Sequence, residues 1–203
     1  MSSIINLHPC FKKWEYFDSI VFYSDPHFGD PQMAKLRGIS DEEQIKNINK
    51  TCGKKSVFVC LGDVGDLECI KKIRGYKVLI KGNHDDRGND YYQRYRVLDF
   101  DGPNFDNYLF DEVYDGPIYI NKKILLSHEP DPDEKHALNI HGHCHDLSYK
   151  NDENHFNVCA EHIGYIPVRL NDLVKSGKLA NIITLHRDTI NKATERKKKR
   201  KVG

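Results

Sequence analysis

Polar residues able to bind metal ions follow several short apolar runs of this 203-residue chain. They are Asp25, His27, Asp63, Asp66, Asn83, His84, His128, His141, His143 and His145. Carboxylate, imidazole and amide oxygen groups suit divalent cations such as Mn, Fe or Zn. Cys144 lies between two of the histidines, but in extended backbone its side chain points away from theirs, which argues against a thiolate site.

The number of candidate ligands indicates more than one metal ion. A tetrahedral zinc needs four ligands. The strand ends offer about seven plausible ligands, which is too many for one ion. Seven ligands suit two ions that share a carboxylate, and pairs of ions about 3.5–4 Å apart hydrolyse phosphate esters.

The segment His141-Gly142-His143-Cys144-His145 places three histidines two residues apart. Alternation along an extended chain would direct them to one side. The spacing alone leaves open what they bind there and whether all three bind it.

Strands and helices that alternate along the chain would position these residues. The sequence predicts strands at 20–23, 56–61 and 76–81, with a capped helix from Ser40 to near Gly53 and a short helix at 67–75 between them. Such sheets place sites at the carboxyl ends of their strands. Further on, we expect a helix near 90–95, a hairpin at 117–130 with its turn at Asn121-Lys122, strands near 156–160 and 166–170, and a helix at 179–195.

The motifs D-x-H, G-D-x-x-D, G-N-H-D, an isolated His and G-H-x-H occur here in that order. This series resembles the calcineurin-like metallophosphoesterase superfamily. The segments SDPHFGD, LIKGNHD, LSHEP, HGHCH and NVCAEHIGYIPVRL resemble its small bacterial and phage-type members. The resemblance implies an α/β fold, a four-layer α-β-β-α sandwich of two mixed β-sheets flanked by helices, with residues 1–195 as a single domain.

The resemblance also implies a role for each matched residue. One metal would be bound by Asp25, His27 and His143, and the other by Asn83, His128 and His141. Asp63 would bridge the two ions. His141 and His143 would thus reach adjacent ions, one each. His145 lies just beyond that pair and is expected outside the ligand set, either hydrogen-bonded behind it or solvated. His84 would stand by the substrate with Asn83, and Asp66 would orient His84 by accepting its other N–H.

The implied reaction is hydrolysis of a phosphate ester, with two divalent ions (Mn, Fe, Ni or Zn) and a metal-bridging hydroxide as the nucleophile. A phosphodiester is favoured, because the short chain leaves no room for a large cap. The alternatives are an inert metal-binding interaction scaffold and a nuclease. Retention of His84 and of every ligand favours an enzyme. Arg37 and Arg87 follow site motifs and are either phosphate contacts or ordinary surface arginines.

Composition indicates a cytoplasmic protein with no membrane segment, since no apolar run approaches about 20 residues. Six scattered cysteines without a C-x-x-C pair are typical of reduced thiols. The segment 196–203 begins with the run RKKKRK, which holds six of the 31 basic residues, against 30 acidic residues in the whole chain. We expect a disordered tail with weak attraction to nucleic acid, or a nuclear-import signal in a eukaryotic setting.

Overall fold

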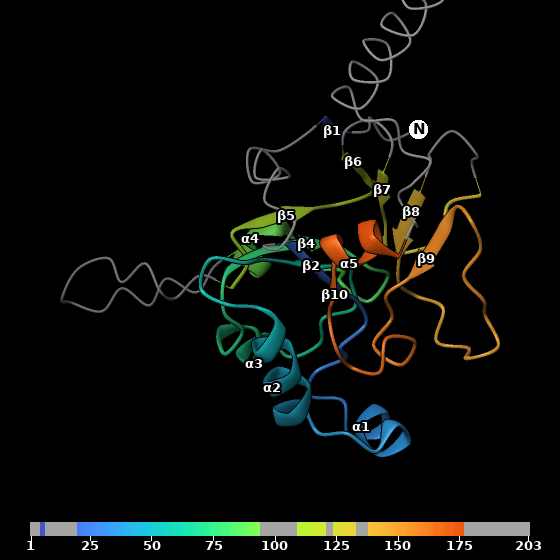
Figure 1. The fold of residues 1–203 in the computed structure, drawn as a ribbon. Helices are drawn as coiled ribbons and strands as arrows, with labels where there is room; N and C mark the ends of the chain where they lie inside the picture. The colour runs from blue at the N-terminus through green and yellow to red at the C-terminus, as the bar shows by residue number, and fades with distance from the viewer. Residues whose placement is uncertain (1–4, 7–19, 94–108, 121–123, 133–137, 177–203) are drawn as a thin grey trace, which may run out of the picture.

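The computed structural model contains two mixed β-sheets and describes residues 5–6, 20–93, 109–120, 124–132 and 138–176 (Figure 1). One sheet has the order β10(Val168–Arg169), β2(Ile20–Tyr23), β3(Val57–Cys60), β4(Tyr76–Ile80), β5(Glu112–Tyr114). The other has the order β1(Ile5–Asn6), β6(Ile118–Ile120), β7(Ile124–Leu126), β8(Leu138–His141), β9(His155–Asn157). Each sheet contains one antiparallel pair, β10 with β2 and β6 with β7, and its other pairs are parallel.

The apolar strands β2, β3 and β4 are covered on both faces, as parallel strands usually are. Alternate side chains such as Phe22 and Val59 pack against Ile120 and Ile140 of the other sheet. The remaining side chains, such as Tyr23, pack on the opposite face. One core therefore lies between the sheets and a second lies outside the β2–β5 sheet.

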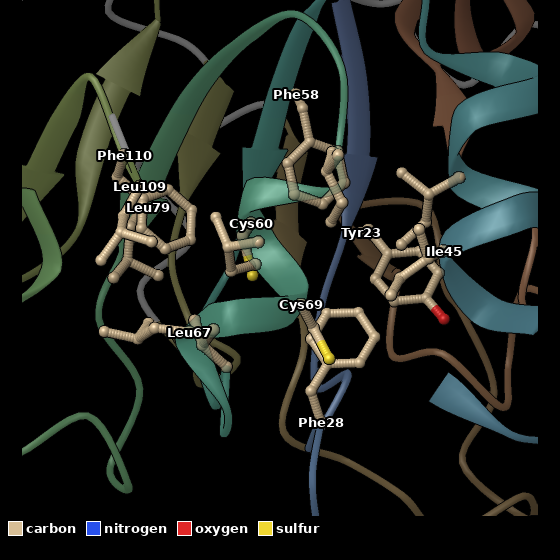
Figure 2. Packing of buried hydrophobic residues seen from close by; sticks show 14 of the residues in the cluster. Tyr23, Phe28, Ile45, Phe58, Cys60, Leu67, Cys69, Leu79, Leu109 and Phe110 are labelled. Atoms are coloured by element: carbon tan, nitrogen blue, oxygen red, sulfur yellow. The ribbon is translucent and has the colours of Figure 1, made fainter. Parts of the chain in front are cut away.

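Helices α2(Asp41–Thr51) and α3(Leu67–Lys71) cover that outer face, on the side of the molecule opposite β6–β9 (Figure 1). Figure 2 shows Ile45 of α2 beside Tyr23, and Cys69 of α3 beside Phe28. The hydroxyl of Ser40 accepts the N–H of Glu43, which starts α2 as the sequence predicts. The remaining helices are α1(Pro31–Arg37), α4(Asn89–Gln93) and α5(Leu170–Lys175).

The predicted β-α-β-α-β order at 20–81 is confirmed, as is the antiparallel pairing of β6 with β7, whereas the predicted turn at 121–122 lies outside the described residues. The sequence did not predict α1, because its helical turns bury no apolar face. The predicted helix at 179–195 and the basic segment 196–203 lie outside the described residues. Five cysteines in the described ranges (Cys52, Cys60, Cys69, Cys144 and Cys159) are free. No helix of the described part is both long and apolar enough to cross a bilayer.

Candidate metal centre

Loops at the carboxyl ends of β2, β3 and β8 hold four predicted ligands in an unusual backbone conformation. Asp25, His27, Asp63 and His143 have φ angles of +57°, +47°, +53° and +66°. Such angles cost about 1–3 kcal/mol for a non-glycine residue and persist only where the surroundings enforce them. Here the Asp25 N–H donates to the Gly62 carbonyl (3.0 Å), and the His143 N–H donates to Asp25 Oδ2 (2.8 Å). The strained loops are thus tied to one another.

The first cluster consists of Asp25, His27 and His145. The Nε2 atoms of the two histidines are 3.3 Å apart, and His145 Nε2 lies 3.5 Å from Asp25 Oδ1. Asp25 Oδ1 is buried without a hydrogen-bond partner among the described residues. A buried carboxylate oxygen left unpaired costs free energy. A cation among these three atoms would remove that cost, so their chemistry fits a metal ion.

The second cluster consists of Asn83, His128 and His143. His128 Nε2 lies 2.9 Å from Asn83 Oδ1 and 3.1 Å from His143 Nδ1, and the last two atoms are also 3.1 Å apart. His128 Nδ1 lies 2.7 Å from the Leu61 carbonyl, which only accepts, so that nitrogen carries the proton. In neutral His128, Nε2 then presents a lone pair to the Asn83 oxygen, an arrangement that a cation would stabilise.

Distances in both clusters are compatible with metal coordination. Ligand atoms about 2.1 Å from a common ion, at tetrahedral or octahedral angles, lie roughly 3.0–3.4 Å from one another. Most of the separations above fall near that range. His27 Nε2 and Asp25 Oδ1, at 4.0 Å, are the widest pair.

Asp63 joins the two clusters. Its Oδ2 lies 3.7 Å from His27 Nε2 in the first and 3.5 Å from His128 Nε2 in the second. Its Oδ1 accepts the backbone N–H of His84 (2.9 Å), which leaves Oδ2 directed between the clusters. The structure therefore places Asp63 where the sequence predicts a bridging carboxylate.

His141 is not brought into either cluster, contrary to the prediction that it is a ligand. Its Nδ1 donates to the Gly142 carbonyl (2.8 Å), and its Nε2 accepts from the Tyr149 hydroxyl (3.0 Å). Burial lowers the pKa of His141 to about 4, which keeps it neutral. His145, expected outside the ligand set, occupies the first cluster, and His143 belongs to the second cluster rather than the first.

The physical reason is where β8 ends. His141 is the last residue of the strand, and His143 already has a positive φ. Alternation of side chains therefore does not continue from His141 to His145. A signal was present in the sequence: counting the G-H-x-H motif from Gly142 selects His143 and His145.

Asp66 does not orient His84 as predicted. Its carboxylate accepts the Glu68 N–H (3.0 Å) and caps α3. His84 is instead held by its backbone N–H, which donates to Asp63 Oδ1. Its side chain is 68% exposed, and its Nε2 lies 3.9 Å from Asp63 Oδ2. A short helix needs a cap at its N-terminus, and in this structure that requirement determines where Asp66 points.

Asp85 fixes the loops, which the sequence analysis did not foresee. Its buried carboxylate accepts the backbone N–H groups of Asp63 (2.8 Å), Val64 (3.2 Å) and Gly82 (2.9 Å). Burial raises the pKa of Asp85, although these three hydrogen bonds oppose the shift. Its place directly after Asn83 and His84 was the available signal.

Arg37 and Glu161 support the first cluster from behind. The Arg37 side chain, 1% exposed, donates to Glu161 Oε1 (2.6 Å) and to the Pro26 and Asp25 carbonyls (2.8 and 2.9 Å), so it is not a phosphate contact. Glu161 Oε1 also accepts from His145 Nδ1 (3.1 Å), which turns His145 Nε2 toward Asp25. This is the carboxylate–histidine arrangement common behind metal ligands.

The same contacts shift the acidity of both partners. The hydrogen bond to Glu161 raises the pKa of His145, and burial opposes it. Burial raises the pKa of Glu161, but the hydrogen bonds from His145 and Cys159 and the charge of Arg37 outweigh it and hold that pKa at about 2. Burial lowers the pKa of His27, against the charges of Asp25 and Asp63. His27 therefore tends toward the neutral form that a metal ligand needs.

Glycine is required at Gly142, where the chain leaves β8 and passes the first cluster. A Cβ atom there would collide with Ser24 and with Asp25 Oδ2. That collision would displace the carboxylate that belongs to the cluster. The absence of a side chain thus permits the close approach of the two loops.

Comparison with known proteins supports the fold. No family model matches the chain, and no curated protein matches it. The structure is similar to the crystal structure of a protein of unknown function, AQ665 from Aquifex aeolicus, with 24% sequence identity and a TM-score of 0.56 over 77% of this chain and 97% of that one. At this identity the likeness concerns the fold alone, and the chain has a mixed α/β fold with two mixed sheets and a few helices.

Proposed function

We propose that the chain is a dinuclear-metal phosphoesterase of the calcineurin-like kind, with a phosphodiester as the favoured substrate. Under this proposal the two sheets are flanked by helices on both sides, which makes a four-layer α-β-β-α sandwich. The observation that carries the proposal is the pair of clusters joined by Asp63, in which carboxylate, amide and imidazole acceptor atoms converge. Such groups repel one another unless cations lie between them.

In this proposal the chain's residues divide between two ions. Asp25, His27 and His145 hold one, and the second cluster, Asn83, His128 and His143, holds the other. Asp63 serves both, and its fixed Oδ1 keeps Oδ2 in place. Two bound divalent cations would neutralise phosphoryl oxygens and make a coordinated water acidic enough to ionise near neutral pH.

His84 and Asn83 complete the site on the substrate side. His84 is exposed, close to Asp63 and to His27 of the first cluster, and able to donate a hydrogen bond or a proton to the leaving oxygen. Asn83 directs its oxygen into the second cluster, so its NH₂ group can face a phosphoryl oxygen. Both residues follow β4 on a loop that Asp85 fixes through Gly82.

An open pocket beside the first cluster supports a diester. It has a volume of about 1100 Å³ and is lined by His27, His84 and His145 among others. A diester must fit organic groups on both sides of the phosphorus atom, and this pocket has room for them.

The test is reconstitution of metal-free protein with Mn, Fe, Ni, Zn or Mg, followed by assay on a panel of monoesters and diesters. We expect two ions per chain and metal-dependent hydrolysis. Asp63→Asn should lower metal content and activity together, whereas Asp172→Asn, an exposed aspartate of α5, should change neither.

Two results would contradict the proposal. Two bound ions without hydrolysis under any condition would leave only the inert metal-binding scaffold. Failure to bind divalent ions at all would show that the clusters are not a metal centre.

A further inference from the structure

Helix α1 carries apolar side chains that belong to neither hydrophobic core. It is capped at both ends, by Asp30 at the N-terminus and by Gly38 at the C-terminus, yet none of its apolar residues is buried. Met33 and Leu36 are three residues apart and so lie on one helix face. Leu36 is 80% exposed. In Figure 1, α1 projects away from the sheets, so the core does not explain this face.

Leu36, Tyr91 and Leu147 line one and the same pocket. Tyr91 of α4 is 53% exposed, and Leu147, in the loop after β8, is 71% exposed. These three are among the five large apolar residues that are exposed in the described part of the chain. Their gathering in one pocket, from three separate segments, points to a ligand rather than to scattered surface residues.

The pocket is continuous with the first cluster of the candidate metal centre. His27, His84 and His145 line it together with Leu36 and Tyr91. A phosphate held at the clusters would therefore extend its organic substituent along this apolar wall. At about 1100 Å³ the pocket exceeds what a phosphate group needs and is of the size that holds ligands of several rings.

Tyr91 is held as a flat platform. Its ring meets that of the buried Tyr92 edge to face, with centroids 5.2 Å apart and planes at 88°. The Arg87 guanidinium lies 5.6 Å from the Tyr91 centroid, and the backbone N–H of Arg87 donates to the Tyr92 hydroxyl (3.3 Å). A ring fixed in this way, beside a planar cation, is suited to stack with a planar group.

The charges of the wall disfavour a long polyanion. The arginines among the described lining residues are Arg37, which is committed to Glu161, and Arg87. Asp30 and Asp86 stand on the same wall. A nucleic-acid strand would meet these carboxylates, whereas an uncharged planar group would not be repelled.

We infer that this wall is a subsite for a planar aromatic substituent of the phosphate ester, bound between Tyr91 and the aliphatic side chains of Leu36 and Leu147. The inference rests on the proposed function for the position of the phosphate. It adds the chemical class of the substrate: an ester whose phosphate carries an aromatic ring.

The test measures binding of phenylphosphonate and methylphosphonate to the metal-loaded protein by calorimetry or ligand-observed NMR. Neither compound has an ester bond to hydrolyse. We expect phenylphosphonate to bind roughly tenfold more tightly, the scale of one stacked ring. Tyr91→Ala and Leu36→Ser should each bring the ratio of the two affinities toward one. The control Ile166→Ser alters a side chain that is 56% exposed and outside the pocket lining, and it should keep the ratio.

Equal affinities in the unmodified protein, or a ratio that survives both pocket substitutions, would overturn the subsite. A parallel assay compares phenyl and ethyl p-nitrophenyl phosphates, which share a leaving group. If both esters are hydrolysed and the phosphonates bind equally, the subsite alone is wrong. If neither phosphonate binds and no ester is hydrolysed, the proposed function fails and the subsite fails with it.

Discussion

Substitution of His145 should weaken metal binding, whereas substitution of His141 should weaken the fold and leave metal binding unchanged. This pair of variants tests the site most directly. His145→Ala removes an imidazole whose Nε2 lies 3.5 Å from Asp25 Oδ1 and 3.3 Å from His27 Nε2. His141→Phe removes an imidazole that contacts Tyr149 and Gly142 instead. A phenyl ring keeps the size of the buried side chain.

The magnitude follows from these contacts. Loss of a hydrogen-bond partner behind a metal ligand costs about 10–100-fold in metal affinity, so loss of the ligand His145 itself should cost at least tenfold, or about 1.4 kcal/mol. His141→Phe should leave metal affinity unchanged. It should instead destabilise the fold by about 1–3 kcal/mol, because the Gly142 carbonyl and the Tyr149 hydroxyl lose their partner.

Competition with a chromophoric chelator measures the affinity of each ion, and urea denaturation of the metal-free protein measures stability. We expect His145→Ala to weaken one of two ions and to keep most of the stability. If His141→Phe loses an ion while His145→Ala binds both with unchanged affinity, our assignment of the first cluster is wrong.

Three further predictions concern the surroundings of the site. Gly142→Ala should reduce metal affinity and stability through collision with the Asp25 loop, whereas Gly88→Ala, with open space around it, should do neither; chelator competition and urea midpoints compare them. Glu161 has a pKa of about 2, below its ordinary 4.5, so its ionised form should stabilise the fold above about pH 4.5. That stabilisation should be lost as the pH falls to about 2. The difference in unfolding free energy between the protein and Glu161→Gln should therefore shrink to zero over this window. Burial lowers the pKa of His155, but the hydrogen bonds to the Asp131 carbonyl and to Asp152 outweigh it, so the pKa is raised. The contribution of His155 to stability should be complete below pH 6.5 and should be lost as the pH rises through the raised pKa. NMR titration should show that Asp152→Asn lowers this pKa.

Local patterns in the chain were sufficient for much of the scaffold. The apolar runs at Ile20–Tyr23 and Val57–Cys60 form strands, because their side chains are buried on both sheet faces whatever else surrounds them. Ser40 and Glu43 begin α2 through a contact that spans three residues. By contrast, α1 has no buried face, so periodicity gave no sign of it.

The choice of metal ligands within the segment His141 to His145 shows where prediction from the local sequence was wrong. Spacing of two residues suggested a common direction for His141 and His143, but that rule holds only while the backbone stays extended. The positive φ of His143 breaks it, and long-range contacts such as that between the His143 N–H and Asp25 impose this angle. Asp66 was misjudged for a related reason, since its hydrogen bond to Glu68 occupies its carboxylate.

The sequence by itself determined the types of candidate ligand and the strand ends that carry Asp25, Asp63 and Asn83, because these depend on residue identity and near neighbours. Only the tertiary structure decided which histidines gather in each cluster, that Asp63 lies between the clusters, and that Asp85 and Glu161 hold them in place. Those relations join residues as distant along the chain as His27 and His145, which are 118 positions apart. Only folding brings such groups within a few ångströms, and the distances and lone-pair directions on which coordination depends exist only then.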